Sequence, residues 1–195
     1  MARQNLQSKS MIEAVTNSSA TQLQQDVMIV FTGTHHHYVT PKFYTETKPA
    51  TSKVVPTWNY SAVEVYGKAT VYYDSSTLET SDYQSKQIHD LSQLCETSIM
   101  GYTGQQGKPE LWSVTEAPEK YIDTIKKNII GVEITIESIT GKFKMSQELC
   151  QGDRDGVIEG FSKLESDVGT HIAAMVKERG DIQASAKNGA VLPSK

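Results

Sequence analysis

The chain has 195 residues, of which 37% are hydrophobic and 22% charged. This balance suits a globular protein with a core of its own and excludes a disordered chain. The formal net charge of −4 argues against broad, non-specific binding of nucleic acid, which needs a basic surface.

Targeting signals are absent from the sequence pattern. The first residues contain no apolar run typical of a signal peptide, and no stretch approaches the roughly 20 apolar residues of a membrane span. Cys95 and Cys150 show no spacing typical of a zinc site, and the helical spacing around Cys95 indicates a core position. We therefore expect a cytoplasmic protein with free thiols and no membrane partner.

The first part of the chain predicts one helix, two strands and a long loop. Residues 9–15 have helical apolar spacing, and the apolar run 27–31 predicts a strand covered on both faces. Residues 38–40 predict a second strand, which Pro41 ends. Residues 42–56 are poor in apolar side chains and predict a surface loop.

The middle of the chain changes from a strand pattern to a helical one. Residues 61–73 alternate and predict a long strand, in which Gly67 indicates a bulge or bend. Residues 75–100 and 117–129 predict helices. The apolar face of the first of these helices consists of Ile88, Leu91, Leu94, Cys95 and Ile99.

The last part of the chain predicts a hairpin and two helices. Residues 130–139 alternate cleanly, and Thr140-Gly141 indicates a tight turn into a second strand at 142–145. Residues 153–164 and 168–178 have helical apolar spacing.

These elements together predict an α+β protein. The hairpin and the bent strand favour an antiparallel or mixed barrel with helices outside it. We expect one domain over residues 1–180 and a flexible tail over residues 181–195, where periodicity fades.

The three consecutive histidines, His35 to His37, resemble the histidine clusters of metal sites. On a strand, His35 and His37 face one way and His36 the other, so only two of them can converge. No carboxylate lies at a supporting short spacing, although Glu46 is nearby in sequence. We expect a loop or barrel-mouth cluster here, and no metal site.

Seven short motifs form a recognisable set. They are Phe31-Thr32-Gly33-Thr34-His35, Tyr38-Val39-Thr40-Pro41-Lys42-Phe43-Tyr44, Val55-Pro56-Thr57-Trp58-Asn59-Tyr60, Val65-Tyr66-Gly67-Lys68, Ile130-Gly131-Val132-Glu133-Ile134, Gly141-Lys142-Phe143-Lys144-Met145-Ser146-Gln147, and Asp153-Arg154 with Val157-Ile158-Glu159-Gly160. In order and approximate spacing they resemble motifs of the PaiB-like, FMN-binding split-barrel family. The resemblance extends from residue 1 to about residue 179.

The resemblance implies a split, mostly antiparallel β-barrel with flanking helices. It implies a homodimer that holds FMN at the subunit interface, and a small-molecule ligand or substrate. The chain departs from the family in two places. Leu6 stands where the family has a proline, and the histidine segment is about one residue longer. The family's first strands precede the point where this chain begins, and whether flavin binds without them stays open.

Lys142, Lys144 and Ser146 alternate along one strand and so share a face. Two ammonium groups and a hydroxyl suit a phosphate, while the alternative is a solvated hairpin face. With the resemblance, Ser146 and Gln147 become the favoured cofactor contacts.

Trp58 follows the long loop, where its ring can stack on a flavin or a substrate. The alternatives are that it plugs one end of a barrel or lies in a dimer interface. Arg3 and Asn5 resemble family residues near the cofactor phosphate, and the alternative is a disordered terminus.

The resemblance favours an FMN-binding protein, either a flavin-dependent oxidoreductase or a flavin-carrying module. No nucleophile–base arrangement identifies a catalytic residue, which a flavin enzyme does not require. The alternative is a non-enzymatic regulator of transcription, or a small-molecule-binding protein that has lost flavin. No basic recognition helix is present, so direct binding to nucleic acid is not expected.

Overall fold

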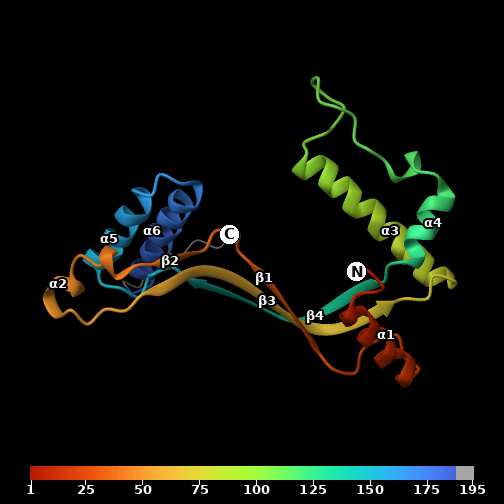
Figure 1. The fold of residues 1–195 in the computed structure, drawn as a ribbon, viewed down its shortest axis with the longest axis horizontal. Coiled ribbons are helices and arrows are strands. Elements are labelled where there is room, and N and C mark those ends of the chain that lie inside the picture. The colour runs from red at the N-terminus through yellow and green to blue at the C-terminus, as the bar shows by residue number, and fades with distance from the viewer. Residues whose placement is uncertain (188–195) are drawn as a thin grey trace. The chain divides into compact units, whose positions relative to one another are not determined.

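The fold is taken from a computed structural model, which describes residues 1–187. The described chain divides into two compact units, each built from two separate stretches (Figure 1). Unit 1 takes residues Met1–Val27 and Tyr66–Glu137, and unit 2 takes Met28–Val65 and the chain from Ser138 onward. The predicted division into residues 1–180 and a tail over 181–195 stays a prediction.

Four antiparallel strands form one sheet, which confirms the α+β class. They are β1 (Val27–Thr32), β2 (His37–Val39), β3 (Thr57–Tyr72) and β4 (Gly131–Lys144). β3 is the organising strand, because β1, β2 and β4 all pair with it. No closure into a barrel is seen among these strands.

The predicted hairpin is wrong, because β4 runs without a turn through Thr140 and Gly141. The reason is the length of its partner. β3 has 16 residues, so both halves of the 14-residue β4 can pair with β3 and need not pair with each other. Alternation alone shows that a segment is extended but not which segment it pairs with.

β3 also continues without interruption through Gly67, where we expected a bulge or bend. A Cβ atom placed on Gly67 would lie 2.0 Å from the carbonyl oxygen of Thr135 in β4. The glycine therefore permits the close approach of the two backbones.

Unit 1 contains a small core beneath its helices. Val15 of α1 (Leu6–Ser18) packs with Val71 and Ile130. Its other helical elements are α3 (Leu78–Leu94), a π-turn (Cys95–Ile99), a 3-10 turn (Val114–Glu116) and α4 (Glu119–Lys127). The helices are where the sequence predicted them, within a few residues.

The predicted core face of α3 and the turn after it is wrong. Leu91, Leu94 and Ile99 are exposed, and Cys95 is only partly buried. The side chains of α3 that are buried are polar, namely Thr80 and Gln84. Helical spacing identifies an apolar face, but it does not show whether another element packs against that face.

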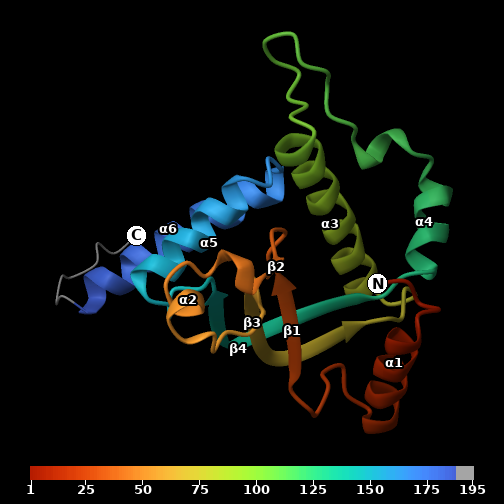
Figure 2. The same ribbon diagram turned by 60° about the vertical axis from the view of Figure 1, so that its left-hand side comes forward.

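Unit 2 packs two helices against the strands of its part of the sheet. α5 (Gln151–Ser162) and α6 (Asp167–Lys187) lie side by side in both views (Figure 1, Figure 2). Its core consists of Val39, Tyr44, Met145, Val157, Phe161, Ile172, Ala173 and Val176. α6 includes residues 181–187 of the predicted tail, and residues 188–195 lie outside the described part.

The predicted loop at 42–56 is partly helical, with a 3-10 turn (Pro41–Phe43) and the short helix α2 (Thr47–Thr51). The prediction that β1 is covered on both faces is wrong, because Met28, Val30 and Phe31 are exposed in this single chain. An apolar run indicates an extended segment but does not show what covers it. Among the described residues, no helix is both long and apolar enough to cross a membrane.

Candidate functional site

Trp58 lies on the sheet of unit 2 with its ring open to solvent. Pairing between β2 and β3 places Trp58 opposite Tyr38. The two rings meet edge to face, with centroids 6.5 Å apart, and remain 47% and 44% exposed. Trp58 Nε1 donates a hydrogen bond of 3.3 Å to Nδ1 of His36. The result is an open aromatic surface whose indole orientation is fixed by a neighbour.

Lys144 contacts the backbone of Trp58 and not its indole. Its ammonium group donates to the hydroxyl of Thr57, and to the carbonyl oxygen of Trp58 at 3.1 Å. An ammonium group has three protons to donate, so one remains for an anion. Lys142 is exposed two residues earlier in β4, on the same face by alternation.

Phe143, between these lysines, faces the other way. The guanidinium of Arg179 in α6 lies 3.5 Å from the centroid of its ring. Lys142 and Lys144 therefore lie on the other face of β4 from Phe143, and Lys144 reaches the backbone of β3 at Trp58. We call Tyr38, Trp58, Lys142 and Lys144 the aromatic–lysine face.

Ser146 and Gln147 have internal roles in the turn after β4. Ser146 is fully buried, has a φ of 57°, and donates a hydrogen bond of 3.0 Å to Oδ1 of Asn59. Gln147 accepts from the amide of Met145 at 2.6 Å and donates to the carbonyl of Phe143 at 2.5 Å. Their assignment as cofactor contacts stays a prediction.

Asn59 is buried on the helix side of the sheet, and its Nδ2 has no hydrogen-bond partner. Its neighbour in the pairing, His37, faces the same core, with its ring edge to face with Phe161 at 5.4 Å. The three histidines thus separate, because His37 points inward while His36 contacts Trp58.

Arg3 and Asn5 belong to unit 1, where both make local contacts. Arg3 donates to the carbonyl of Tyr73 at 2.5 Å, and Asn5 caps α1 by accepting from the amide of Gln7 at 2.8 Å. Arg3 and Lys9 also line a surface pocket of about 340 Å³. Their proposed place near a cofactor phosphate stays a prediction.

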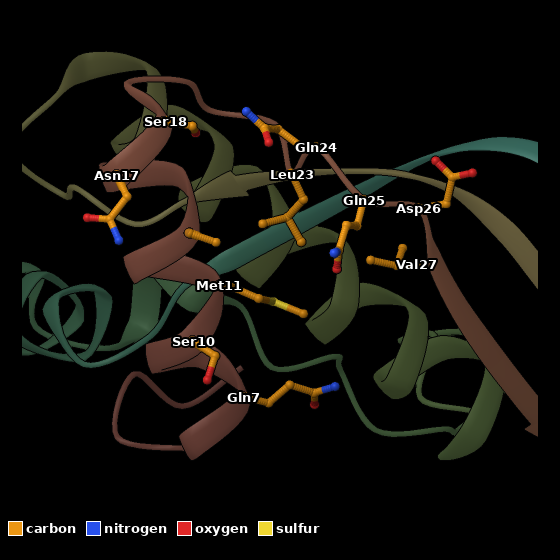
Figure 3. A pocket seen from close by; sticks show the side chains of 11 residues that line it. Gln7, Ser10, Met11, Asn17, Ser18, Leu23, Gln24, Gln25, Asp26 and Val27 are labelled. Atoms are coloured by element: carbon orange, nitrogen blue, oxygen red, sulfur yellow. The ribbon is translucent and has the colours of Figure 1, made fainter.

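A larger hollow, of about 570 Å³, lies in unit 1 between α1 and the segment before β1 (Figure 3). Its lining combines amide and hydroxyl side chains with the apolar Met11, Ala14, Leu23 and Val27, and Asp26 is its acid. No Lys or Arg lines it, so its chemistry is poorly suited to a phosphate.

The loop before β3 is held by a reciprocal pair of carboxylates. Asp153 accepts from the amides of Glu46 at 2.8 Å and Thr47 at 3.0 Å, while Glu46 accepts from the amide of Gly152 at 2.9 Å. Burial alone would raise the pKa of Asp153, but the hydrogen bonds from Thr47 and Glu46 lower it overall. Glu46 is therefore engaged with α5 and not with the histidines.

Comparison with known proteins identifies the family. The family described as "Putative FMN-binding domain" matches residues 1–138. The chain belongs to this PaiB-like family. Tyr38 and Trp58 of the aromatic–lysine face lie within the match, whereas Lys142 and Lys144 follow its end.

Relatives of this PaiB-like chain occur in fungi and bacteria. An uncharacterized protein of Aspergillus fumigatus is 58% identical over 189 residues, which are 94% of this chain and 72% of that protein. A second, from Emericella nidulans, is 54% identical over 188 residues, with the same two shares. The protease synthase and sporulation protein PAI 2 of Bacillus subtilis is 28% identical over 155 residues, 80% of this chain and 64% of that protein.

Proposed function

We propose that this PaiB-like chain binds FMN on the aromatic–lysine face and supports a flavin-dependent redox reaction of a small molecule. The observation that carries the proposal is the half-exposed indole of Trp58, together with the ammonium group of Lys144 on the backbone carbonyl of the same residue. FMN presents a flat ring and a phosphate. The indole suits the ring, and the ammonium group suits the phosphate. Family membership over residues 1–138 supports the same ligand.

The side chains of this face have separate tasks in the proposal. The indole of Trp58 provides a surface for ring stacking, and its hydrogen bond to His36 keeps that surface in place. Lys144 and Lys142 provide positive charge for the phosphate. Bound FMN would supply the electron transfer, while the protein supplies position and electrostatics.

A homodimer, with an expected split-barrel site between subunits, is part of the proposal. Apolar side chains exposed on β1 and β4 of unit 2 support it, because a second copy of the chain could bury apolar groups that one chain leaves in water. These side chains are Met28, Val30, Phe31 and Ile139.

The test uses the fact that the chain has two tryptophans, Trp58 and Trp112. In the Trp112→Phe variant, Trp58 is the sole tryptophan, so FMN stacked on it should quench most of the remaining emission. Trp58→Leu should weaken FMN binding at least about tenfold, since aromatic stacking contributes about 1–3 kcal/mol. FMN fluorescence, read at a wavelength where the protein does not emit, measures the affinity of every variant.

The matched control is Trp112→Leu, because Trp112 is 42% exposed and belongs to unit 1. It should bind FMN as the unchanged protein does. Equal affinity in Trp58→Leu and the unchanged protein would place FMN elsewhere. Absence of FMN binding by the unchanged protein would favour the alternative, a non-enzymatic regulator or a binder of another small molecule. The name of the Bacillus subtilis relative, which concerns protease synthase and sporulation, supports a regulatory alternative.

A further inference from the structure

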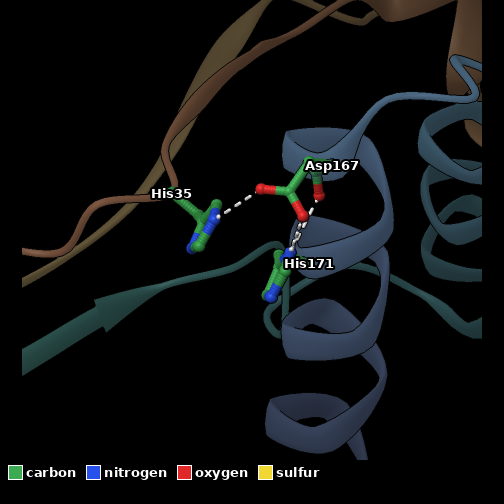
Figure 4. Close-up of side chains that lie close together, drawn as sticks. All are labelled: His35, Asp167 and His171. Atoms are coloured by element: carbon green, nitrogen blue, oxygen red, sulfur yellow. Dashed lines mark hydrogen bonds and ion pairs between the residues drawn. The ribbon is translucent and has the colours of Figure 1, made fainter. Parts of the chain in front are cut away.

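Two histidines and an aspartate meet at the start of α6 in unit 2 (Figure 4). His35 comes from the connection between β1 and β2, and Asp167 is the first residue of α6. His171 lies one helical turn after Asp167, so both point from the same side of the helix. One potential ligand atom from each residue lies within 4.8 Å of the other two.

Asp167 lies at the edge of the two imidazoles, and its carboxylate contacts one ring nitrogen of each. Its Oδ2 is 3.3 Å from Nε2 of His35, and its Oδ1 is 3.2 Å from Nδ1 of His171. This carboxylate is 132 residues from His35, which is why no supporting acid was visible near the histidines in the sequence.

We propose that His35, Asp167 and His171 form a binding site for a divalent transition-metal ion of the Zn²⁺ or Ni²⁺ class. Two imidazoles and one carboxylate suit these ions, whereas Ca²⁺ and Mg²⁺ require oxygen ligands. Three protein ligands leave further coordination positions for water or a small molecule. The inference does not depend on FMN binding.

The second ring nitrogens have the supporting contacts that metal-bound histidines need. Nδ1 of His171 faces the carboxylate of Asp167 and is also 2.9 Å from its backbone carbonyl, to which it can donate. This hydrogen bond leaves Nε2 for the ion once the ring has turned. Nδ1 of His35 is 3.1 Å from the hydroxyl of Thr34, which can accept or donate. A metal ion at Nε2 of His35 would replace the proton now shared with Asp167, and Nδ1 would carry the proton instead.

The two imidazole rings stack in parallel, with centroids 4.0 Å apart and planes 3° apart. A metal–nitrogen bond lies in the plane of its imidazole ring, so two parallel rings cannot both bind one ion. Metal binding must therefore open the stack by turning at least one ring. Side-chain exposures of 25% for His35, 51% for His171 and 77% for Asp167 leave room for this turn and for entry of the ion.

The test is a calorimetric titration of Zn²⁺ and of Ni²⁺ into the full chain, without a histidine tag and after removal of metals by a chelator. We expect one ion per chain. Asp167→Asn and His171→Gln should each weaken binding at least about tenfold, since even supporting residues of a metal site contribute that much. Asp167→Asn keeps a side-chain oxygen at the start of α6, and circular dichroism checks that each variant is folded.

Two controls address binding by the histidine run alone. His36→Gln changes the neighbour of His35, and His89→Gln changes an exposed histidine of unit 1; both should keep the affinity of the unchanged protein. The proposal is overturned if the unchanged protein binds no ion. It is also overturned if Asp167→Asn and His171→Gln bind as tightly as the unchanged protein, or if His36→Gln loses as much affinity as they do.

A fluorescence measurement gives an independent readout. His36 adjoins His35 in the chain and accepts the hydrogen bond from Trp58, so an ion at His35 would lie close to that indole. In the Trp112→Phe variant, saturating Ni²⁺ should quench the emission of Trp58. The quenching should disappear when His171→Gln is added, and quenching that persists there would contradict the site.

Discussion

Asp153 shows how one buried charge can organise the loop that leads to β3. The side chain is 2% exposed, yet two backbone amides donate to its carboxylate, and one of them opens α2. Its place in the first turn of α5 adds a favourable interaction with the helix dipole. The ionised form is therefore favoured in the folded chain, in agreement with the lowered pKa.

The lowered pKa of Asp153 should make the stability of the protein depend on pH in a definite direction. Because the pKa of Asp153 is lower in the folded state, its stabilisation is present above the unfolded value of about 3.9 and is lost as pH falls through the folded value. Asp153→Asn should cost about 1–2 kcal/mol at neutral pH, since charged hydrogen bonds are replaced by neutral ones. Urea unfolding at several pH values measures this difference.

The difference between the unchanged protein and Asp153→Asn should shrink below pH of about 3.9. Asp155→Asn is the matched control, because Asp155 is exposed two residues later in the same helix. A constant difference at every pH would show that the charge of Asp153 is not the cause.

At the scale of elements, the long pairing of β3 with β4 decides the architecture. Gly67 of β3 allows the approach of Thr135, and its absence of a side chain is a steric requirement there. Gly141 of β4 differs, because a Cβ atom placed on it meets nothing within 4 Å. Gly67 and Gly141 therefore offer a matched comparison.

We expect Gly67→Ala to lower the free energy of unfolding by about 1–3 kcal/mol, because the new methyl group would overlap the backbone of β4. Gly141→Ala should leave it unchanged or raise it slightly, since alanine loses less backbone entropy on folding. Denaturant unfolding of both variants provides the measurement. Equal stability of the two would rule out close approach as the reason for Gly67.

Much of the secondary structure could be predicted from the sequence, because it depends on local periodicity. The alternation before Gly67 located β3, and the apolar spacing of α5 and α6 located both helices. The pairing of β4 could not be predicted, since Thr140-Gly141 is equally compatible with a turn and with a continuous strand.

For the candidate sites too, local patterns could be predicted from the sequence and long-range contacts could not. Trp58 was found from its local pattern, but its partner Tyr38 follows only from the β2–β3 register. Likewise, the proposed metal site needs a carboxylate and a histidine from α6, and no local pattern connects them with His35. Long-range pairing, not residue type, was the missing information.

At the scale of the whole molecule, the exposed apolar side chains of β1 and β4 need a partner surface if the proposed homodimer is correct. Ile139 of β4 is 63% exposed, and its side chain is entirely apolar. Burial of such side chains between subunits is the main source of stability in a homodimer. The dimer thus gives a physical reason for apolar groups that the single chain leaves in water.

Sedimentation should give twice the chain mass of 21.6 kDa for the unchanged protein. Ile139→Lys should raise the dissociation constant of the dimer at least about tenfold, because it places an unpaired charge in the interface. Leu91→Lys, at an exposed apolar position of α3 in unit 1, is the control and should remain a dimer. A monomeric unchanged protein would contradict the proposed assembly.

The division of β3 and β4 between the two units has a practical consequence for dissecting the protein. The boundaries after Val65 and after Glu137 both fall inside strands, where linkers between separable domains are not found. A fragment ending at either point would leave a truncated strand with unpaired backbone groups, which invite aggregation. Neither unit is therefore a natural candidate for separate expression, and functional assays belong on the intact chain.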